Sequence, residues 1–289
     1  MAAGVEALLL GPLEVWRRDA PLALGGPGQR ALLARLLLDA NRSVAIERLV
    51  DDLWGECVPS SAVKMVHIHV SRLRKLLPAG TLLTQPPGYV VRIEPDALDL
   101  VRFERLRARG RGALAAGSAS EAAEMLRRAL ALWRGQALVE FDEPFAAIEA
   151  ARLEERRLDC LEDRIDADLA LGRHAQLIGE LDVLTTQHPL RERPRAQLML
   201  ALYRSGRQAD ALAAYRQLHR MLAVELGLRP SPALRDLERQ MLQQDPALEA
   251  RPRPSAIPLR LPDPARVPAG TGWRAARRAR RGPCVRRCR

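Results

Sequence analysis

The hydrophobic period changes several times within the first 95 residues. Over residues 5–24 the apolar positions form short runs separated by Gly11-Pro12, which predicts short β-strands. Leucines then recur at three- and four-residue spacing over 28–39, and a shorter run of the same period covers 46–54. Both segments are predicted to be helices, because apolar residues at this spacing lie on one helix face.

A third helix is predicted to begin near Ser60 or Ser61, either of which can act as an N-cap, and to end at Leu77 before Pro78. Two apolar runs of residues that favour β-strands follow, one on each side of Pro86-Pro87-Gly88, and this pattern is typical of a hairpin. Strands, three helices and a closing hairpin predict a winged helix-turn-helix over residues 1–96.

Residues 97–249 have helical period in every segment, with helix-breaking residues between the segments. The predicted helices cover residues 99–109, 119–133, 145–171, 174–187, 192–205, 208–226 and 232–243.

A repeat is visible in this helical region, because Gly172 and Gly206 lie 34 residues apart and each precedes a helix. The apolar residues after the two glycines match at equal offsets: Leu177 with Ala211, Leu181 with Tyr215, and Leu184 with Leu218. Gly117 begins the same spacing once more, with Ala122, Leu126 and Ala129. This period is the tetratricopeptide signature. The predicted fold class is therefore mainly α, with an N-terminal winged helix-turn-helix (α+β) followed by an all-α tetratricopeptide-like domain over 97–249.

The net charge of +11 comes from one end of the chain. Residues 1–96 carry 11 basic and 10 acidic side chains, and residues 97–250 carry 23 and 24. Residues 251–289 carry 12 and 1, together with seven prolines. The composition predicts a disordered Arg/Pro-rich tail over 250–289. Within the predicted folded part, residues 60–93 hold five basic side chains and no acid, so charge favours a nucleic-acid surface there.

Composition makes several other classes of protein improbable. Aromatic residues are 3% of the chain, which is too few for broad base-stacking platforms, and four cysteines cannot form a disulfide scaffold. No leader and no apolar run near ~18 residues is present, so we expect a cytoplasmic protein without a membrane partner. No motif for phosphate binding, metal binding or nucleophilic catalysis stands out, so we expect no enzymatic activity, no cofactor and no metal.

The third helix divides into an apolar and a basic face when its residues are placed at 100° intervals. Its buried stripe is predicted to contain Val66, Val70, Leu73 and Leu77, with His69 at the margin. The other face carries the candidate DNA-binding residues Lys64, His67, Ser71, Arg72, Arg74 and Lys75. A helix fits the major groove of B-DNA, where arginine can bond guanine O6 and N7. A basic face that only contacts solvent is the alternative interpretation.

The hairpin offers Gln85, Tyr89 and Arg92 beside its tip. Arg92 is a candidate partner for phosphate, because wings lie along the DNA backbone or minor groove. For Tyr89 we favour a packed strand aromatic over direct contact with DNA.

Acidic residues crowd the predicted helix 145–171, and arginines such as Arg156 and Arg164 interleave with them. The spacing predicts a solvated face of ion pairs formed within that helix.

The sequence resembles the Streptomyces antibiotic regulatory proteins. The resemblance rests on Gly11-Pro12-Leu13-Glu14-Val15, on GGPGQRALLARLLLDAN from Gly25, on Leu53-Trp54-Gly55-Glu56, on VHIHVSRLRKL from Val66 and on Pro86-Pro87-Gly88-Tyr89. The segment from Val66 resembles the recognition helix of OmpR-type winged helices, and residues 97–245 resemble the bacterial transcriptional activator domain.

This resemblance implies a transcriptional activator for a secondary-metabolite gene cluster. Such proteins bind direct repeats in double-stranded DNA, in tandem or as homodimers, and recruit RNA polymerase holoenzyme through its sigma factor. The polymerase-facing loop would be Gly55, Glu56, Cys57, Val58 and Pro59. Arg72 and Arg74 match the usual DNA-binding arginines, with Arg72 expected to contact a base, and His67 occupies a variable position that faces DNA. The family commonly has an arginine directly after the wing's Gly-Tyr, whereas this chain has Val90, so wing contact would depend on Arg92.

A helical-repeat interaction scaffold is the alternative function. In that interpretation the winged helix binds a protein partner. The acid-free stretch 60–93 argues against it, because a protein-binding wing has no need to exclude acidic residues.

Removal of the basic tail tests where specificity resides. We expect a chain truncated after Ala250 to fold and still to select its operator, with lower affinity for all DNA at low salt, because the tail adds only counterion-release affinity. Titration of the full and truncated chains with operator and random duplexes measures both effects. Loss of discrimination between the two duplexes would contradict this expectation.

Overall fold

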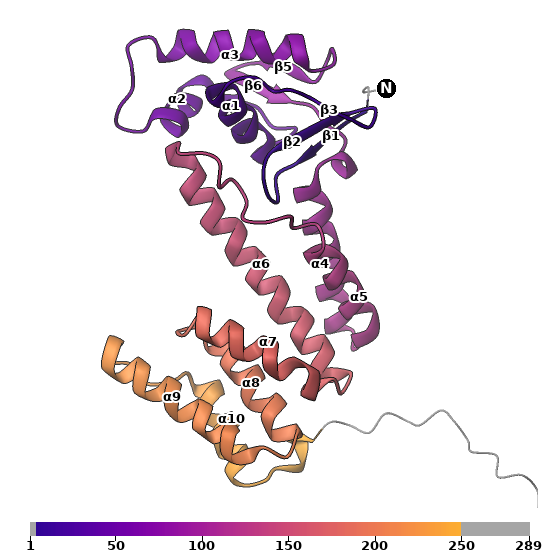
Figure 1. The fold of residues 1–289 in the computed structure, drawn as a ribbon, viewed down its shortest axis with the longest axis vertical. Helices are drawn as coiled ribbons and strands as arrows, with labels where there is room; N and C mark the ends of the chain where they lie inside the picture. Colours follow the sequence, from indigo (N-terminus) through magenta and orange to yellow (C-terminus); the bar gives the residue numbers. More distant parts are fainter. Residues whose placement is uncertain (1–3, 250–289) are drawn as a thin grey trace, which may run out of the picture. The chain divides into compact units, whose positions relative to one another are not determined.

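The computed structural model describes residues 4–249 (Figure 1). The tail predicted to be disordered, with Cys284 and Cys288, lies outside the described residues. None of the helices between residues 4 and 249 combines the length and the apolar character that crossing a bilayer requires.

The described part of the chain begins with a small antiparallel sheet of β1 (Val5–Leu8), β2 (Glu14–Arg17) and β3 (Ala20–Pro21), in that order. Side chains alternate between the core and the surface along β1, since Val5 and Ala7 are buried. The strands predicted over residues 5–24 are therefore confirmed.

Three helices and a second sheet complete the N-terminal part. The helices are α1 (Pro27–Leu38), α2 (Ile46–Trp54) and α3 (Ala62–Leu76). The second sheet has the order β4-β6-β5, with β4 (Val44–Ala45), β5 (Leu82–Gln85) and β6 (Gly88–Val91). Hairpin β5–β6 is the predicted wing, and a short 3-10 helix, η1 (Pro95–Ala97), follows it. The winged helix-turn-helix is confirmed.

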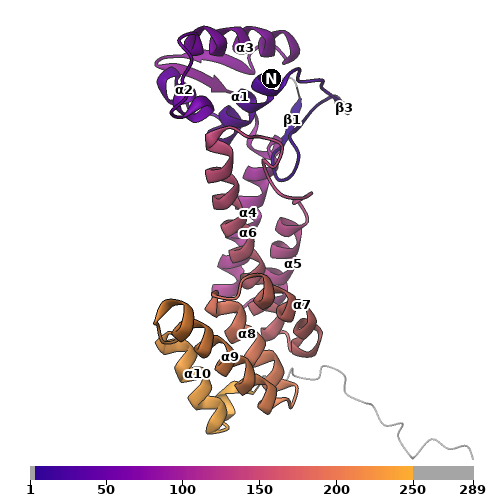
Figure 2. The same cartoon turned by 60° about the vertical axis from the view of Figure 1, so that its left-hand side comes forward.

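Seven α-helices form the rest of the described chain (Figure 2). They are α4 (Asp99–Ala115), α5 (Ala119–Leu130), α6 (Pro144–Ala170), α7 (His174–Gln187), α8 (Glu192–Arg204), α9 (Gln208–Leu226) and α10 (Pro232–Leu242), with the 3-10 helix η2 (Pro246–Leu248) last. The mainly α architecture that the sequence predicts is therefore what the structure shows.

The repeat predicted from sequence has a counterpart in the backbone. Gly117, Gly172 and Gly206 each end the first helix of a helix pair, with φ of 77°, 75° and 76°. Glycine is favoured there because other residues rarely adopt positive φ. The matched apolar positions after these glycines are all buried: Ala122, Leu126, Ala129, Leu177, Leu181, Leu184, Ala211, Tyr215 and Leu218.

Helix α4 continues past Gly110, where the sequence predicts that it ends at residue 109. A Cβ on Gly110 would lie 2.5 Å from Leu126 Cγ, so the glycine allows α4 and α5 to approach closely. The glycine marks a close helix contact rather than a helix end.

Helix α6 contributes to both hydrophobic cores of the described residues. Leu153 and Ala167 belong to a core that also contains the winged helix, α4 and α5. Leu158 and Ile165 belong to a second core with α7 to α10. Cys160 is also buried, and burial raises the pKa of its thiol to about 12. Both cores therefore depend on one helix.

The carboxylate of Asp99, at the first residue of α4, is buried against the N-terminal sheet. It accepts hydrogen bonds from the backbone N–H of Leu9 at 2.8 Å, of Leu10 at 2.9 Å and of Leu100 at 2.7 Å. Burial raises the pKa of Asp99 above its ordinary value, and the hydrogen bonds from these backbone N–H groups oppose that shift. This contact joins the winged helix to the helical region, and no pattern in the sequence indicates it.

Arg134, in the connection between α5 and α6, makes a second link to the same segment. Its Nη1 donates to Glu14 at 2.6 Å and its Nη2 to the carbonyl of Pro12 at 2.8 Å. Its backbone N–H donates to the carbonyl of Leu10 at 2.7 Å. Nearby, Glu140 accepts from the backbone N–H of Leu13 and pairs with Arg30 of α1. The connection from α5 to α6 is therefore bound along the N-terminal strands.

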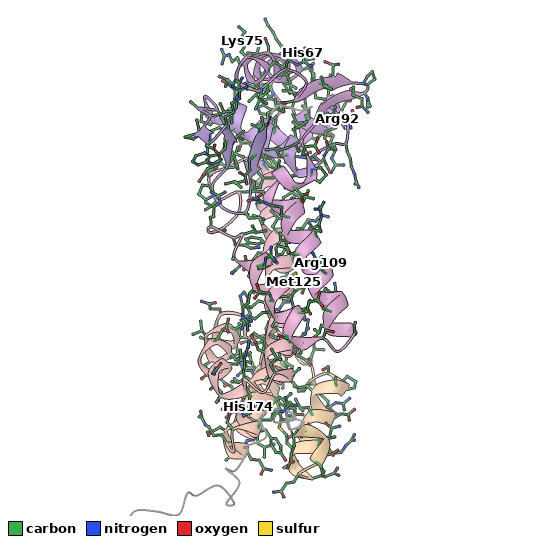
Figure 3. The ribbon with its side chains drawn as sticks, turned by 90° about the vertical axis from the view of Figure 1, so that its right-hand side faces the viewer. His67, Lys75, Arg92, Arg109, Met125 and His174 are labelled. Atoms are coloured by element: carbon green, nitrogen blue, oxygen red, sulfur yellow. The ribbon has the colours of Figure 1, made fainter. Side chains whose placement is uncertain are left out.

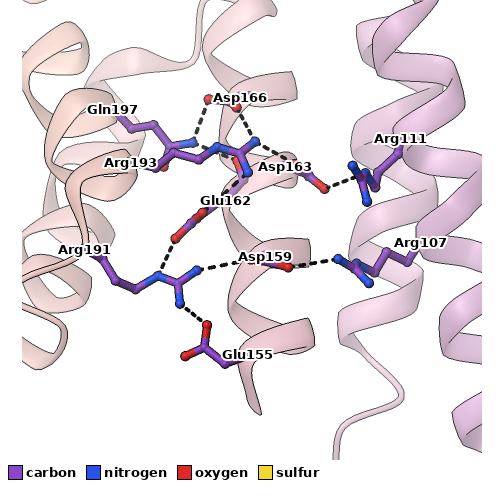
Figure 4. Close-up of polar contacts among 10 residues, drawn as sticks. All are labelled: Arg107, Arg111, Glu155, Asp159, Glu162, Asp163, Asp166, Arg191, Arg193 and Gln197. Atoms are coloured by element: carbon purple, nitrogen blue, oxygen red, sulfur yellow. Dashed lines mark hydrogen bonds and ion pairs between the residues drawn. The ribbon is translucent and has the colours of Figure 1, made fainter. Parts of the chain in front are cut away.

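The prediction that the acids of α6 pair within a solvated helix face is wrong for Glu162 and Asp163, which are buried. Arg191 donates to Glu162 at 2.8 Å and also pairs with Glu155 and Asp159 (Figure 4). Bonds to Glu162 and Glu155 outweigh burial and hold the pKa of Arg191 above its ordinary value.

Three further arginines extend this ladder of ion pairs on α6. Arg193 donates to Asp163 and Asp166, both at 2.6 Å. From the other side, Arg107 and Arg111 of α4 reach Asp159 and Asp163. The ladder thus joins α4, α6 and the start of α8, and its partners are far apart in sequence.

Truncation of Leu181 tests the second core. Leu181 is 0% exposed, so Leu181→Ala should lower the free energy of unfolding by about 2–5 kcal/mol. Val183→Ala is the matched control on the same helix, because Val183 is 56% exposed. Thermal unfolding measures both, and circular dichroism follows loss of helix. Equal destabilisation by the two changes would contradict this assignment of the core.

Candidate nucleic-acid interface

Helix α3 presents one apolar and one basic face, as predicted. Val66, Val70, Leu73 and Leu77 are buried, which confirms the apolar stripe. The six candidate residues on the opposite side are all exposed: Lys64, His67, Ser71, Arg72, Arg74 and Lys75. Figure 3 shows His67 and Lys75 on the outer side of this helix.

Lys64, Arg72 and Lys75 have neither a carboxylate partner nor a side-chain hydrogen bond within the described residues. Between residues 4 and 249, no acidic oxygen lies within 4.0 Å of a side-chain nitrogen of Lys64, Arg72 or Lys75. A polyanion reaching this face would meet charges that are not already neutralised by the protein.

Arg74 differs, because the wing already occupies its guanidinium. Its Nε donates to the carbonyl of Leu82 at 3.0 Å, and its Nη2 donates to the Thr84 hydroxyl at 2.8 Å. The same guanidinium lies 5.7 Å from the centre of the Tyr89 ring, at cation–π distance. Arg74 therefore fixes the wing against α3.

His67 and Tyr89 complete this contact between α3 and the wing. The two rings meet edge to face at 6.3 Å. Tyr89 is 7% exposed, so the interpretation of Tyr89 as a packed strand aromatic is confirmed. His67 and Arg74 lie on the outer face as the helical period predicts, whereas the hairpin beside them is a tertiary contact that this period does not indicate.

Arg92 lies at the base of the wing and remains exposed. Its Nη2 donates to Gln85 Oε1 at 2.9 Å, and its Nη1 to the carbonyl of Asn41 at 3.4 Å. These two bonds hold the side chain next to the strand that leads away from the hairpin tip.

His69 packs between α3 and α1, at the margin of the core as predicted. Its Nε2 would lie 2.9 Å from a Cβ on Gly28. Burial, together with the charge of Arg72, lowers the pKa of His69 below its ordinary value, which disfavours a positive charge on this ring.

The loop Gly55–Pro59 follows α2 and lies at the start of α6. A Cβ on Gly55 would lie 3.1 Å from Pro144 Cγ, the first residue of that helix. Glu56, Cys57 and Val58 are exposed, and Val58 is 46% exposed despite its apolar side chain. The loop thus offers an acidic and an apolar group to solvent.

Two domain families match the chain in the order of the structure. Residues 21–90 match the family described as "Transcriptional regulatory protein, C terminal", and residues 98–242 match the "Bacterial transcriptional activator domain". The chain belongs to the Streptomyces antibiotic regulatory protein family of transcriptional regulators.

Relatives in this family extend across most of the chain. Regulatory protein DnrI of Streptomyces peucetius is 37% identical over 253 residues, which cover 83% of this chain and 93% of DnrI. Regulatory protein AfsR of Streptomyces coelicolor is 49% identical over 241 residues, which cover 83% of this chain and 24% of AfsR. The chain therefore spans about a quarter of the length of AfsR.

A solved family structure has the same architecture. The structure of Mycobacterium tuberculosis EmbR in complex with a low-affinity phosphopeptide aligns with a TM-score of 0.80 and 39% identity. The alignment covers 84% of this chain and 66% of the EmbR chain.

A methyl group at Gly88 tests how the wing is held. Its Cβ would lie 1.8 Å from the carbonyl oxygen of Val44, so Gly88→Ala must separate β4 from β6. We expect a fall in melting temperature and loss of the β4–β6 amide protection in hydrogen exchange. Gly112→Ala serves as the control, because no atom beyond its neighbouring residues and the backbone of its own helix lies within 4 Å of the added Cβ. Full protection of β4 and β6 in Gly88→Ala would show that this close approach is not required.

Proposed function

We propose that this chain is a sequence-specific DNA-binding transcriptional activator whose helix α3 enters the major groove. The observation that carries the proposal is the outer face of α3, where Lys64, Arg72 and Lys75 are exposed without a carboxylate partner. The face lies in a stretch without acid, residues 60–93, so nearby charge also favours DNA. Family membership supports the same function.

Different residues of α3 take different roles in this proposal. Arg72 reads a base, because a free guanidinium can bond guanine O6 and N7 together. Lys64 and Lys75, near the two ends of the helix, contact phosphate, and Ser71 lies between the basic residues. His67 faces the groove beside the wing.

Arg74 and Arg92 act at the wing. Arg74 positions the hairpin, since three groups of the wing already hold its guanidinium. Arg92 contacts phosphate in the place of the family's usual wing arginine, with its guanidinium oriented by Gln85.

We assign DNA recognition to residues 1–96 and the activator function to residues 97–249 together with the loop Gly55–Pro59. That loop contacts RNA polymerase holoenzyme, including its sigma factor, while α3 is bound to direct repeats in tandem or as a homodimer. Exposure of Glu56, Cys57 and Val58 on the domain that carries α3 supports this arrangement. The regulated genes form a secondary-metabolite cluster, and the protein acts in the cytoplasm.

Two substitutions on α3 test base reading against phosphate contact. Selection of bound duplexes from a random pool first defines the operator. Arg72→Ala should lower operator affinity and relax preference at one base pair of each repeat, at a cost of about 1–3 kcal/mol. Lys64→Ala should weaken operator and random DNA alike and reduce the salt slope by about one unit.

Arg128→Ala is the matched control, because Arg128 is exposed on α5 rather than on α3. Titrations of operator and random duplexes at several salt concentrations measure all three variants. If Arg72→Ala changed neither affinity nor base preference, DNA reading through this face would be refuted and the protein-scaffold function would become the better explanation.

A further inference from the structure

Arg195 of α8 is a buried cation whose charge is poorly compensated. Three arginines are buried among the described residues: Arg35, Arg164 and Arg195. Arg35 pairs with Asp39 and Asp52, and Arg164 pairs with Asp168 and Glu180. Arg195 is 4% exposed and has no such pair with any residue between 4 and 249.

The hydrogen bonds of Arg195 are also incomplete. Its Nη1 donates to Gln217 Oε1 of α9 at 3.3 Å, whereas its buried Nε finds no acceptor. Burial lowers the pKa of Arg195, and the more distant Asp182 opposes that effect only in part. Buried charges are normally paired, because removal of an ion from water is costly. An unpaired one therefore indicates that a further partner belongs at this position.

Arg195 is one of the residues that line a pocket. It has a volume of about 460 Å³ and is formed by α7, α8 and α9. Leu198, Leu202 and Ala214 give it an apolar wall, while Arg195, Gln217 and Arg220 supply hydrogen-bond donors.

The other charged groups of the pocket leave it with an excess of positive charge. Arg207 and Asp210 pair with each other at 2.7 Å, and Asp182 is the remaining acid. Arg220 is exposed, and no carboxylate among the described residues pairs with it. Among the charged residues that line the pocket, the two arginines Arg195 and Arg220 therefore outnumber the single unpaired acid, Asp182.

We infer that this pocket binds a small organic acid, with its carboxylate on Arg195 and its apolar body against Leu198 and Leu202. The planar guanidinium fork matches the two oxygens of a carboxylate, and the volume lies in the range of small-ligand sites. Binding gives the Arg195 guanidinium the anionic partner that it lacks and stabilises α7, α8 and α9 together. This inference does not depend on the proposed DNA contact.

Ligand-induced stabilisation of the full chain tests the inference. The probes are benzoate, phenylacetate and octanoate, each compared with its neutral amide at equal ionic strength. At least one acid should raise the melting temperature in a saturable way, because a ligand that binds only the folded state stabilises it. The neutral amide of that acid should bind at least about tenfold more weakly than the acid, since it lacks the negative charge.

Two variants and one control locate the site. Arg195→Met should fold with an unchanged or higher melting temperature, because an apolar side chain replaces an unpaired buried charge, and should lose about tenfold or more in affinity for the acid. Arg220→Gln, on the surface, should weaken binding without affecting folding. Arg216→Gln, at another exposed position of α9, should leave binding unchanged.

Three results would overturn the inference: no acid of the panel stabilises the chain, an amide binds as well as its acid, or Arg220→Gln and Arg195→Met both retain full affinity. Should Arg195→Met fail to fold, Arg220→Gln against Arg216→Gln decides the question alone. DNA titration of the same variants should give unchanged operator affinity without the acid, which separates this site from α3.

Discussion

The carboxylate of Asp99 is the contact on which the arrangement of the winged helix and the helical region depends. It accepts hydrogen bonds from the backbone N–H groups of Leu9 and Leu10, which directly follow β1. It also accepts one from the N–H of Leu100 in the first turn of α4. Leu9, Leu98 and Phe103 belong to the same hydrophobic core, so the polar contact lies inside a continuous apolar packing. Burying a carboxylate is costly unless it is fully hydrogen-bonded, and three backbone donors meet that requirement.

A second constraint follows from the shared helix α6. Its two sides complete different cores, and its acids are bound by arginines of α4 and α8. Arginine suits this task because its planar fork can bond two acids at once, as Arg191 and Arg193 both do. A displacement of α6 would therefore disturb both cores and the ladder together, which makes the described helices an interdependent set.

Much of the fold follows from local sequence, as the bounds of α2, α7 and α9 show, since each matches its expected range. Hydrophobic period and breaking residues determine such elements within a few neighbours. The predicted helix end before Gly110 was wrong, because the role of this glycine depends on its contact with Leu126 of another helix. Asp99, Arg134 and the ladder were missed because their partners lie tens of residues away. On α3 the helical wheel identified the outer face correctly, whereas the capture of Arg74 by the wing depends on tertiary packing that no wheel contains.

The exposed face of α3 has a chemical consequence beyond its charge. Lys64 and Lys75 are the only lysines in the sequence, and both lie on this helix, about 16 Å apart along its axis. Every other basic side chain, histidine aside, is a guanidinium. Apart from the chain's own amino terminus, the primary amines of this protein are therefore confined to α3. Acetylation of lysine, which removes its positive charge, would act on this helix and leave the ion pairs of the helical region untouched.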